Sequence, residues 1–80
     1  MDEVVELTKT EYRILFELGS RPGQVLSREV LLERVWGYGY LGDDRLVDVH
    51  IRSLRTKVEP DPTHPVVVVT VKGLGYKALP

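Results

Sequence analysis

Two periods in the placement of apolar residues predict three helices followed by a β-hairpin. Apolar residues recur every three or four positions, as on one side of a helix, in the segments 8–19, 27–37 and 43–58. Residues 66–71 are β-branched at every position, which favours a strand, and residues 76–79 return as its partner beyond a glycine-flanked turn. Residues 4–7 are expected to form an edge strand at the front, and residues 23–26 a very short strand between the first two helices.

Capping side chains mark where each helix begins. Thr8 and Glu11 have the spacing of a capping box, in which each side chain bonds the backbone of the other residue. Ser27 is expected to cap the second helix, and either Asp43 or Asp44 the third. Residues that end or interrupt helices follow each segment: Gly19 and Pro22, Gly37, and Pro60 and Pro62.

The apolar sides of the first two helices are expected to supply the core. On the first helix, core packing is favoured over a ligand site for Tyr12 and Phe16. On the second helix, the buried side is expected to consist of Val30, Leu31, Val35 and Trp36.

The third helix combines a core stripe with an outer face of mixed chemistry. At about 100° per residue, one stripe contains Val47, Ile51, Leu54 and Val58. The opposite side holds cations, hydroxyls and a single valine: Arg45, Val49, Arg52, Ser53 and Thr56. A solvated face needs no valine, whereas a DNA major groove offers thymine methyl groups to an apolar side chain and guanine edges or phosphates to guanidinium groups. The pattern favours a DNA-reading helix over a charged surface that carries a scattered valine.

Composition and charge narrow the class of protein. The 80 residues suffice for one small domain, and the absence of cysteine argues against disulfides and suits a reducing cytoplasm. No stretch has the pattern of a membrane span or a signal peptide. The net charge is −1, but residues 1–44 hold nine acidic and five basic residues, whereas residues 45–80 hold three acidic and six basic ones. The second half therefore carries a local surplus of positive charge that suits an anionic partner.

Catalysis and nucleotide binding are not expected. The segment GYGYLG at 37–42 matches G-x-G-x-x-G, but it follows a predicted helix, whereas dinucleotide binding needs a preceding strand. The two histidines, His50 and His64, have no nucleophile or metal ligand at a recognised spacing. We therefore expect no enzyme, no cofactor and no metal site.

Four linked segments carry a family resemblance: LTKTEY at 7–12, SREVLLERVWG at 27–37, DRLVDVHIRSLR at 44–55 and TVKGLGY at 70–76. Together they resemble the winged-helix effector domain of OmpR/PhoB-type two-component response regulators, over nearly the whole chain. The resemblance implies an α+β winged helix-turn-helix domain over residues 1–80, with three helices and a C-terminal hairpin wing. It also implies that the family's N-terminal sheet is shortened to its last strand and that the receiver domain, with its phosphorylated aspartate, is absent.

The resemblance further implies a bacterial, cytoplasmic regulator of transcription in a phosphorelay. Its third helix would enter the major groove of promoter DNA and its wing the minor groove, as dimers on direct repeats. The positions that match the family's DNA contacts are Arg45, Val49, His50, Arg52, Ser53, Arg55, Thr56, Thr70 and Lys72. The loop that would face RNA polymerase or a promoter factor comprises Gly37, Tyr38, Gly39, Tyr40, Leu41, Gly42 and Asp43.

Two departures limit what the resemblance says about the target. Ser53 stands where some relatives carry arginine, and Lys72 where many carry arginine, and both changes weaken the transfer of any particular relative's target sequence to this chain. The alternative reading is a winged-helix module that binds protein through its tyrosine-rich loop and wing.

Overall fold

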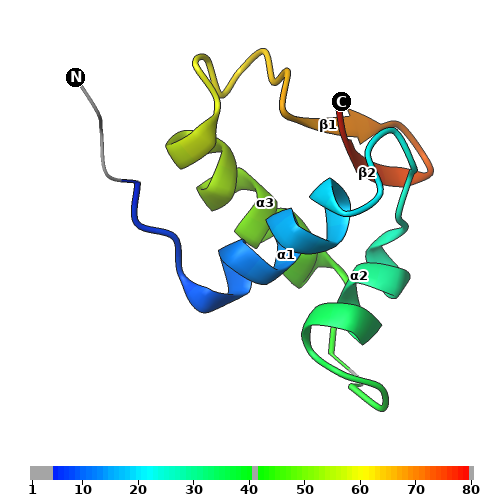
Figure 1. The fold of residues 1–80 in the computed structure, drawn as a ribbon. Helices are drawn as coiled ribbons and strands as arrows, with labels where there is room; N and C mark the ends of the chain where they lie inside the picture. The colour runs from blue at the N-terminus through cyan, green and yellow to red at the C-terminus, as the bar shows by residue number, and fades with distance from the viewer. Residues whose placement is uncertain (1–4, 41, 80) are drawn as a thin grey trace.

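Three helices and a two-stranded hairpin follow one another along the chain (Figure 1). The helices are α1 (Lys9–Gly19), α2 (Arg28–Val35) and α3 (Arg45–Val58), and the strands are β1 (Val68–Val71) and β2 (Gly75–Ala78). The computed structural model describes residues 5–40 and 42–79. The predicted winged helix-turn-helix architecture is confirmed, with α2 and α3 as its two central helices and the hairpin as its wing. Within the described residues, no helix has the length and apolar character needed to cross a membrane.

The helix starts follow the predicted capping chemistry. The hydroxyl of Thr8 accepts the N–H of Glu11 at 3.1 Å, and the Glu11 carboxylate accepts the N–H of Thr8 at 2.8 Å, which completes the capping box. Ser27 accepts the N–H of Val30 at 3.1 Å at the start of α2. At α3 the carboxylate that binds a free amide is that of Asp43, which accepts the N–H of Arg45 at 2.9 Å.

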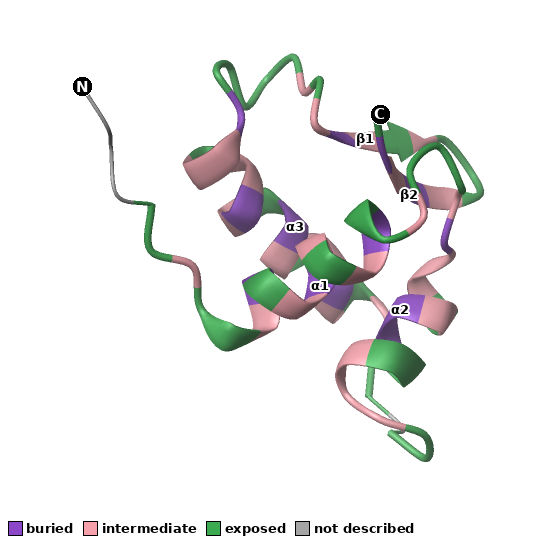
Figure 2. Ribbon diagram, viewed as in Figure 1, coloured by how far each residue is buried: buried purple, intermediate pink, exposed green. Residues whose placement is uncertain are grey.

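The core lies where the three helices meet the inner side of the hairpin (Figure 2). α3 contributes the predicted stripe, with Val47, Ile51 and Leu54 fully buried. On α2, Leu31 is buried as predicted, and Leu32, which the prediction omitted, is buried as well. The partly buried residues that pack against this core include Val30, Val35, Trp36 and Val58.

The expected burial of Tyr12 and Phe16 is wrong. The two side chains are 56% and 53% exposed, and their rings stack on each other with centroids 6.3 Å apart. The side of α1 that packs into the core is instead defined by Ile14 and Leu18, both fully buried. Tyr12 and Phe16 lie about half a turn away from that stripe, so they share the outer side of α1.

The wing is an antiparallel hairpin held to the segment before α2. Its register pairs Val68 with Ala78 and Val71 with Gly75. The short strand expected at 23–26 is present as a single bridge between Leu26 and Tyr76. Gly75 has a φ of 145°, and a Cβ there would lie 2.1 Å from the carbonyl oxygen of Leu26, so only glycine permits this close approach.

The first strand is shorter than predicted, for a reason visible in the structure. The carboxylate of Glu59, just after α3, accepts the N–H groups of Val66, Val67 and Val68 at 2.7–3.0 Å. The Val67 N–H thus donates to a side chain and not to Leu79, and the paired strand begins at Val68. The edge strand expected at 4–7 is not formed by residues 5–7, and Val4 lies outside the described residues.

Candidate nucleic-acid interface

The side of α3 that faces away from the core is a continuous row of exposed side chains. Arg45, Val49, Arg52 and Thr56 follow one another at intervals of three or four residues, and all four are exposed. Such spacing places them along one side of the helix. We call these four residues the outer face of α3. Val49 is 63% exposed, so the predicted helical phase is confirmed and the valine has no packing role in the core.

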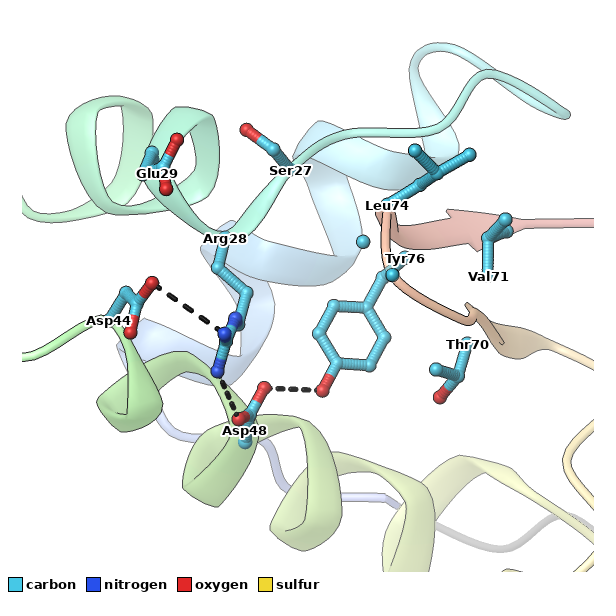
Figure 3. Close-up of a pocket in the computed structure, with 11 residues that line it drawn as sticks. Ser27, Arg28, Glu29, Asp44, Asp48, Thr70, Val71, Leu74 and Tyr76 are labelled. Carbon is cyan, nitrogen blue, oxygen red and sulfur yellow. Dashed lines mark hydrogen bonds and ion pairs between the residues drawn. The ribbon is translucent and has the colours of Figure 1, made fainter.

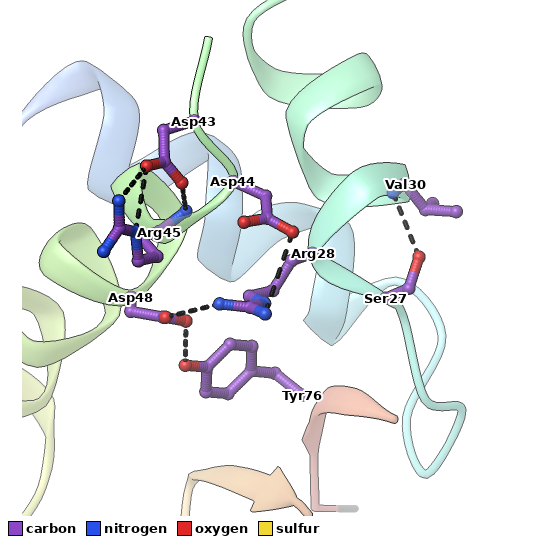
Figure 4. A network of polar contacts seen from close by, with 8 residues as sticks. All are labelled: Ser27, Arg28, Val30, Asp43, Asp44, Arg45, Asp48 and Tyr76. Carbon is purple, nitrogen blue, oxygen red and sulfur yellow. Dashed lines mark hydrogen bonds and ion pairs between the residues drawn. The ribbon is translucent and has the colours of Figure 1, made fainter. Parts of the chain in front are cut away.

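Arg45, at the start of this face, is paired within the chain. Its Nε and Nη2 atoms donate to Asp43 Oδ2 at 2.9 and 2.6 Å, while its backbone N–H donates to Oδ1 (Figure 4). These bonds lower the pKa of Asp43 to about 2, mainly through the side-chain bond from Arg45. Because the pair is largely exposed, its net contribution to stability is small, and Arg45 can exchange Asp43 for another anion.

Ser53 and Thr56 use their hydroxyls inside the chain. The Ser53 hydroxyl donates to the buried carboxylate of Glu11 on α1, and the Thr56 hydroxyl donates to the backbone carbonyl of Ser53 at 2.6 Å. Ser53 is therefore half-buried at the border with α1, whereas Thr56 remains on the outer face. The predicted contact between Ser53 and DNA stays a prediction that competes with this bond.

Arg55 connects α3 to the wing. Its Nε donates to the carbonyl oxygen of Val68 at 3.0 Å, and its Nη2 donates to the hydroxyl of Thr70 at 2.7 Å. The guanidinium also lies over the ring of Tyr76, 5.6 Å from its centroid. The structure thus brings Arg55 and Thr70 together, beside the outer face rather than on it.

A second link between α3 and the wing runs through Asp48. Arg28, at the start of α2, donates to Asp48 Oδ2 at 2.9 Å, and the hydroxyl of Tyr76 donates to Asp48 Oδ1 at 2.5 Å (Figure 3). Arg28 also lies 3.7 Å from Asp44. Burial, reinforced by the bond to the Asp48 carboxylate, raises the pKa of Tyr76 to about 12, so its hydroxyl keeps its proton at neutral pH.

These residues line a polar hollow of about 360 Å³ between α2, α3 and the wing. The charge of Arg28 inside it is balanced by two aspartates, which makes the hollow a structural junction. Sequence reasoning missed the roles of Arg28, Asp48 and Tyr76, because their partners lie 20 and 28 residues apart along the chain. The only signal in the sequence was the family resemblance, whose segments DVHI at 48–51 and GLGY at 73–76 contain Asp48 and Tyr76.

The turn of the wing carries the predicted cation. Lys72 is exposed at the first position of the Lys72-Gly73-Leu74 turn, where Gly73 has a φ of 78°. Leu74 beside it is 65% exposed. The hairpin therefore presents one positive charge and one apolar side chain at its tip.

The loop between α2 and α3 exposes aromatic rings. Tyr38 is 84% exposed and Tyr40 42% exposed, and the ring of Tyr40 lies 6.3 Å from that of Trp36. The ring of His50 on α3 also packs against Trp36, and the two ring centroids lie 5.4 Å apart. Leu41 lies outside the described residues. A helix precedes the G-x-G-x-x-G segment, as predicted, so the strand that a dinucleotide site needs is missing from this position.

Comparisons with known proteins agree with this geometry. A family model described as "Transcriptional regulatory protein, C terminal" matches residues 2–78. The DNA-binding response regulator MtrA of Mycobacterium tuberculosis is 54% identical over 78 residues, which cover 98% of this chain and 34% of MtrA. The chain thus spans about a third of the length of the curated relatives it matches.

Solved structures share the fold. The response regulator DrrB of Thermotoga maritima, an OmpR/PhoB homolog, superposes with a TM-score of 0.87 at 36% identity, over 95% of this chain and 34% of DrrB. The DNA-binding domain of Klebsiella pneumoniae RstA, solved in complex with the RstA box, gives a TM-score of 0.83 at 37% identity, over 94% of this chain and 74% of that one. The chain therefore belongs to the family of C-terminal domains of transcriptional regulatory proteins, the winged-helix effector domains of OmpR/PhoB-type response regulators.

Proposed function

We propose that this chain binds promoter DNA as the output domain of a two-component transcriptional response regulator. The observation that carries the proposal is the exposure of Val49 on α3, in a row with Arg45, Arg52 and Thr56. In the major groove, the arginines can reach guanine edges or phosphates, the threonine hydroxyl can bond either, and the valine can touch a thymine methyl group. The RstA domain, which shares the fold, was solved with its DNA box.

The wing supplies the second part of the proposed interface. Lys72 at its tip would reach the adjacent minor groove or its phosphates, and Thr70 the backbone beside it. Arg55 lies beside the outer face, and His50 packs against Trp36 near the start of α3; both would add phosphate contacts from these positions. Because α3 and the wing are joined through Arg55 and Asp48, the two parts would meet DNA as one rigid surface.

Several finer assignments belong to the same proposal. Residues 1–80 would act as one effector domain, attached in the full-length protein to a receiver domain whose phosphorylation drives dimers onto direct repeats. The loop at 37–43, with Tyr38 and Tyr40 exposed, would face RNA polymerase or a promoter factor. We place the protein in the bacterial cytoplasm and assign it no catalytic activity, in keeping with its family.

One observation favours a second candidate function. Tyr38 in the loop and Leu74 at the wing are 84% and 65% exposed, and aromatic and apolar side chains are typical of protein-binding surfaces. In that case the domain would be a protein-interaction module that uses its tyrosine-rich loop and wing.

A titration of the purified domain against duplex DNA over a range of salt concentrations separates the two functions. With about four to six phosphate contacts per monomer, a plot of log K against log salt should have a slope near −4 to −5, because counterions leave the DNA on binding. A protein-binding module need not show this dependence. A slope near zero, with no preference for any sequence selected from random DNA, would contradict DNA binding.

A further inference from the structure

Glu11 is a buried carboxylate that the proposed contacts with DNA do not use. Its side chain is only 1% exposed, although it lies in the first turn of α1, as the third residue of the helix. The carboxylate accepts the backbone N–H of Thr8 at 2.8 Å, the Nζ of Lys57 at 2.6 Å and the hydroxyl of Ser53. A capping box requires only the first of these bonds, so the other two need a separate explanation.

Both additional partners come from α3. Ser53 and Lys57 lie four residues apart, so they occupy neighbouring turns on one side of the helix. Two bonds to one fixed carboxylate, at two heights along α3, oppose rotation of α3 about its own axis. Apolar packing alone resists such a rotation less specifically, because dispersion contacts are not directional. Any rotation of α3 would also carry Val49 and Arg52 out of line with a DNA groove.

The same bonds remove two polar side chains from the surface offered to DNA. Ser53 borders the outer face of α3, but its hydroxyl proton is directed at Glu11. The ammonium of Lys57 is balanced by the same carboxylate within hydrogen-bond distance. Because this pair is far less exposed than the pair of Arg45 and Asp43, we expect Lys57 to keep its partner and to release few counterions when DNA binds.

We infer that Glu11 is a positioning residue for DNA recognition, which fixes the rotation of α3 through Ser53 and Lys57 and keeps both side chains out of contact with DNA. The inference rests on the proposed function. Among the cations of α3, it makes Arg52 a residue that contacts DNA and Lys57 a structural one. It also assigns Ser53 to the inside of the domain.

The first test compares two cations of α3 by the salt dependence of DNA binding. Arg52→Gln should flatten the plot of log K against log salt by about one unit, as expected for a lost phosphate contact. Lys57→Gln should leave the slope as it is in the unsubstituted domain. Equal flattening by the two substitutions would show that Lys57 meets phosphate, and the inference would be overturned.

The second test measures discrimination, as the ratio of affinity for a selected site to affinity for random DNA. Glu11→Gln keeps the shape of the side chain but removes its charge, and the ratio should fall at least threefold, about the loss that a weakened base contact produces. Glu17→Gln is the matched control, because Glu17 lies on the same helix and pairs with Arg21 and Arg34 instead of α3. A change in the folded fraction cancels in the ratio, so a purely structural role for Glu11 would leave it unchanged and overturn the inference.

A measurement on the unsubstituted domain covers the case in which a variant does not fold. The carbon resonance of the Glu11 side-chain carboxylate should keep its position when DNA is added at neutral pH, because its partners stay in place. A large displacement would show that DNA takes Lys57 or Ser53 away and would contradict the inference. Failure of the unsubstituted domain to bind DNA with salt dependence would instead overturn the proposed function itself.

Discussion

The hydroxyl of Tyr76 on β2 donates to Asp48 on α3 across 2.5 Å, and this bond joins the wing to the first turn of the helix that carries the outer face. The ring of the same tyrosine lies under the guanidinium of Arg55, two turns further along α3. Tyr76 is therefore held between two charged residues of one helix. Together with the bonds from Arg55 to Val68 and Thr70, this side chain sets the relative position of helix and wing.

Tyr76→Phe should lower the free energy of unfolding by about 1–2 kcal/mol. The substitution removes a partly buried bond to a charged acceptor but keeps the ring. Tyr38→Phe is the matched control, because Tyr38 is 84% exposed, and it should change stability by less than about 0.5 kcal/mol. Urea unfolding of both variants checks the difference, and equal stability of Tyr76→Phe and the unsubstituted domain would refute the role of the bond.

Acid should destabilise the domain through Glu11. Burial opposes the charged carboxylate, but bonds from Lys57, Ser53 and Thr8 outweigh burial and lower its pKa from 4.5 to about 2. Because the folded-state pKa is depressed, the stabilisation is complete above about pH 4.5 and is lost as the pH falls from 4.5 towards 2, a change on the order of 3 kcal/mol.

Thermal melts between pH 7 and pH 2 measure this loss. Glu11→Gln should melt at a lower temperature at pH 7 and show a shallower decline between pH 4.5 and pH 2. Part of the decline should persist in the variant, because the pKa of Glu59 is also lowered by its backbone bonds, against the effect of burial. A decline as steep as that of the unsubstituted domain would mean that Glu11 is not the titrating group.

Gly75→Ala should destabilise the domain by more than about 3 kcal/mol. The positive φ of this residue and a Cβ position 2.1 Å from the Leu26 carbonyl oxygen leave no room for a side chain. Gly19→Ala serves as the control, since Gly19 ends α1 with open space around it, and should be neutral or slightly stabilising. If the two variants have the same melting temperature, the close approach of the wing to Leu26 is not required for folding.

The sequence was most informative where local chemistry decides the structure. The capping box of Thr8 and Glu11, the cap at Ser27 and the core stripe of α3 all follow from residue spacing, and the structure confirms them. The exposure of Val49 followed in the same way, from the phase of that stripe.

Predictions from the sequence were weakest where the structure depends on contacts between distant residues. The burial of Tyr12 and Phe16 was predicted wrongly, because an apolar face wider than the core does not reveal which part of it is covered. The prediction that the first strand begins at Val66 was wrong. The N–H groups of Val66 and Val67 donate to the Glu59 carboxylate, and the strand begins at Val68. The partnerships of Glu11 with Lys57 and of Asp48 with Tyr76 span 46 and 28 residues, which no local periodicity reports.

Lys72→Ala should weaken binding to many DNA sequences and flatten the salt dependence by about one unit, if the lysine mainly meets phosphate. Lys77→Ala is a suitable control, because Lys77 is a cation of the same hairpin, on β2 rather than at the turn. The measurement is the slope of log K against log salt for both variants. An unchanged slope and affinity for Lys72→Ala would show that the tip of the wing does not touch DNA.

The stability of Val49→Ala should differ from that of a core substitution. Val49 is 63% exposed, so truncation leaves no cavity, and alanine is the better helix former by roughly 0.5 kcal/mol. The free domain should therefore be equally stable or slightly more stable. Destabilisation well above about 1 kcal/mol would indicate a buried valine.

The central claim, that the outer face of α3 reads the major groove, is tested most directly by Val49 and a thymine methyl group. The unsubstituted domain and Val49→Ala are titrated against a selected site and against the same site with individual thymines replaced by uracil, which lacks the methyl group. We predict that one replacement weakens DNA binding by the unsubstituted domain by about 1 kcal/mol and leaves binding by Val49→Ala almost unchanged. Binding of both proteins to random DNA should stay the same. Equal losses for both proteins at every thymine would contradict the account.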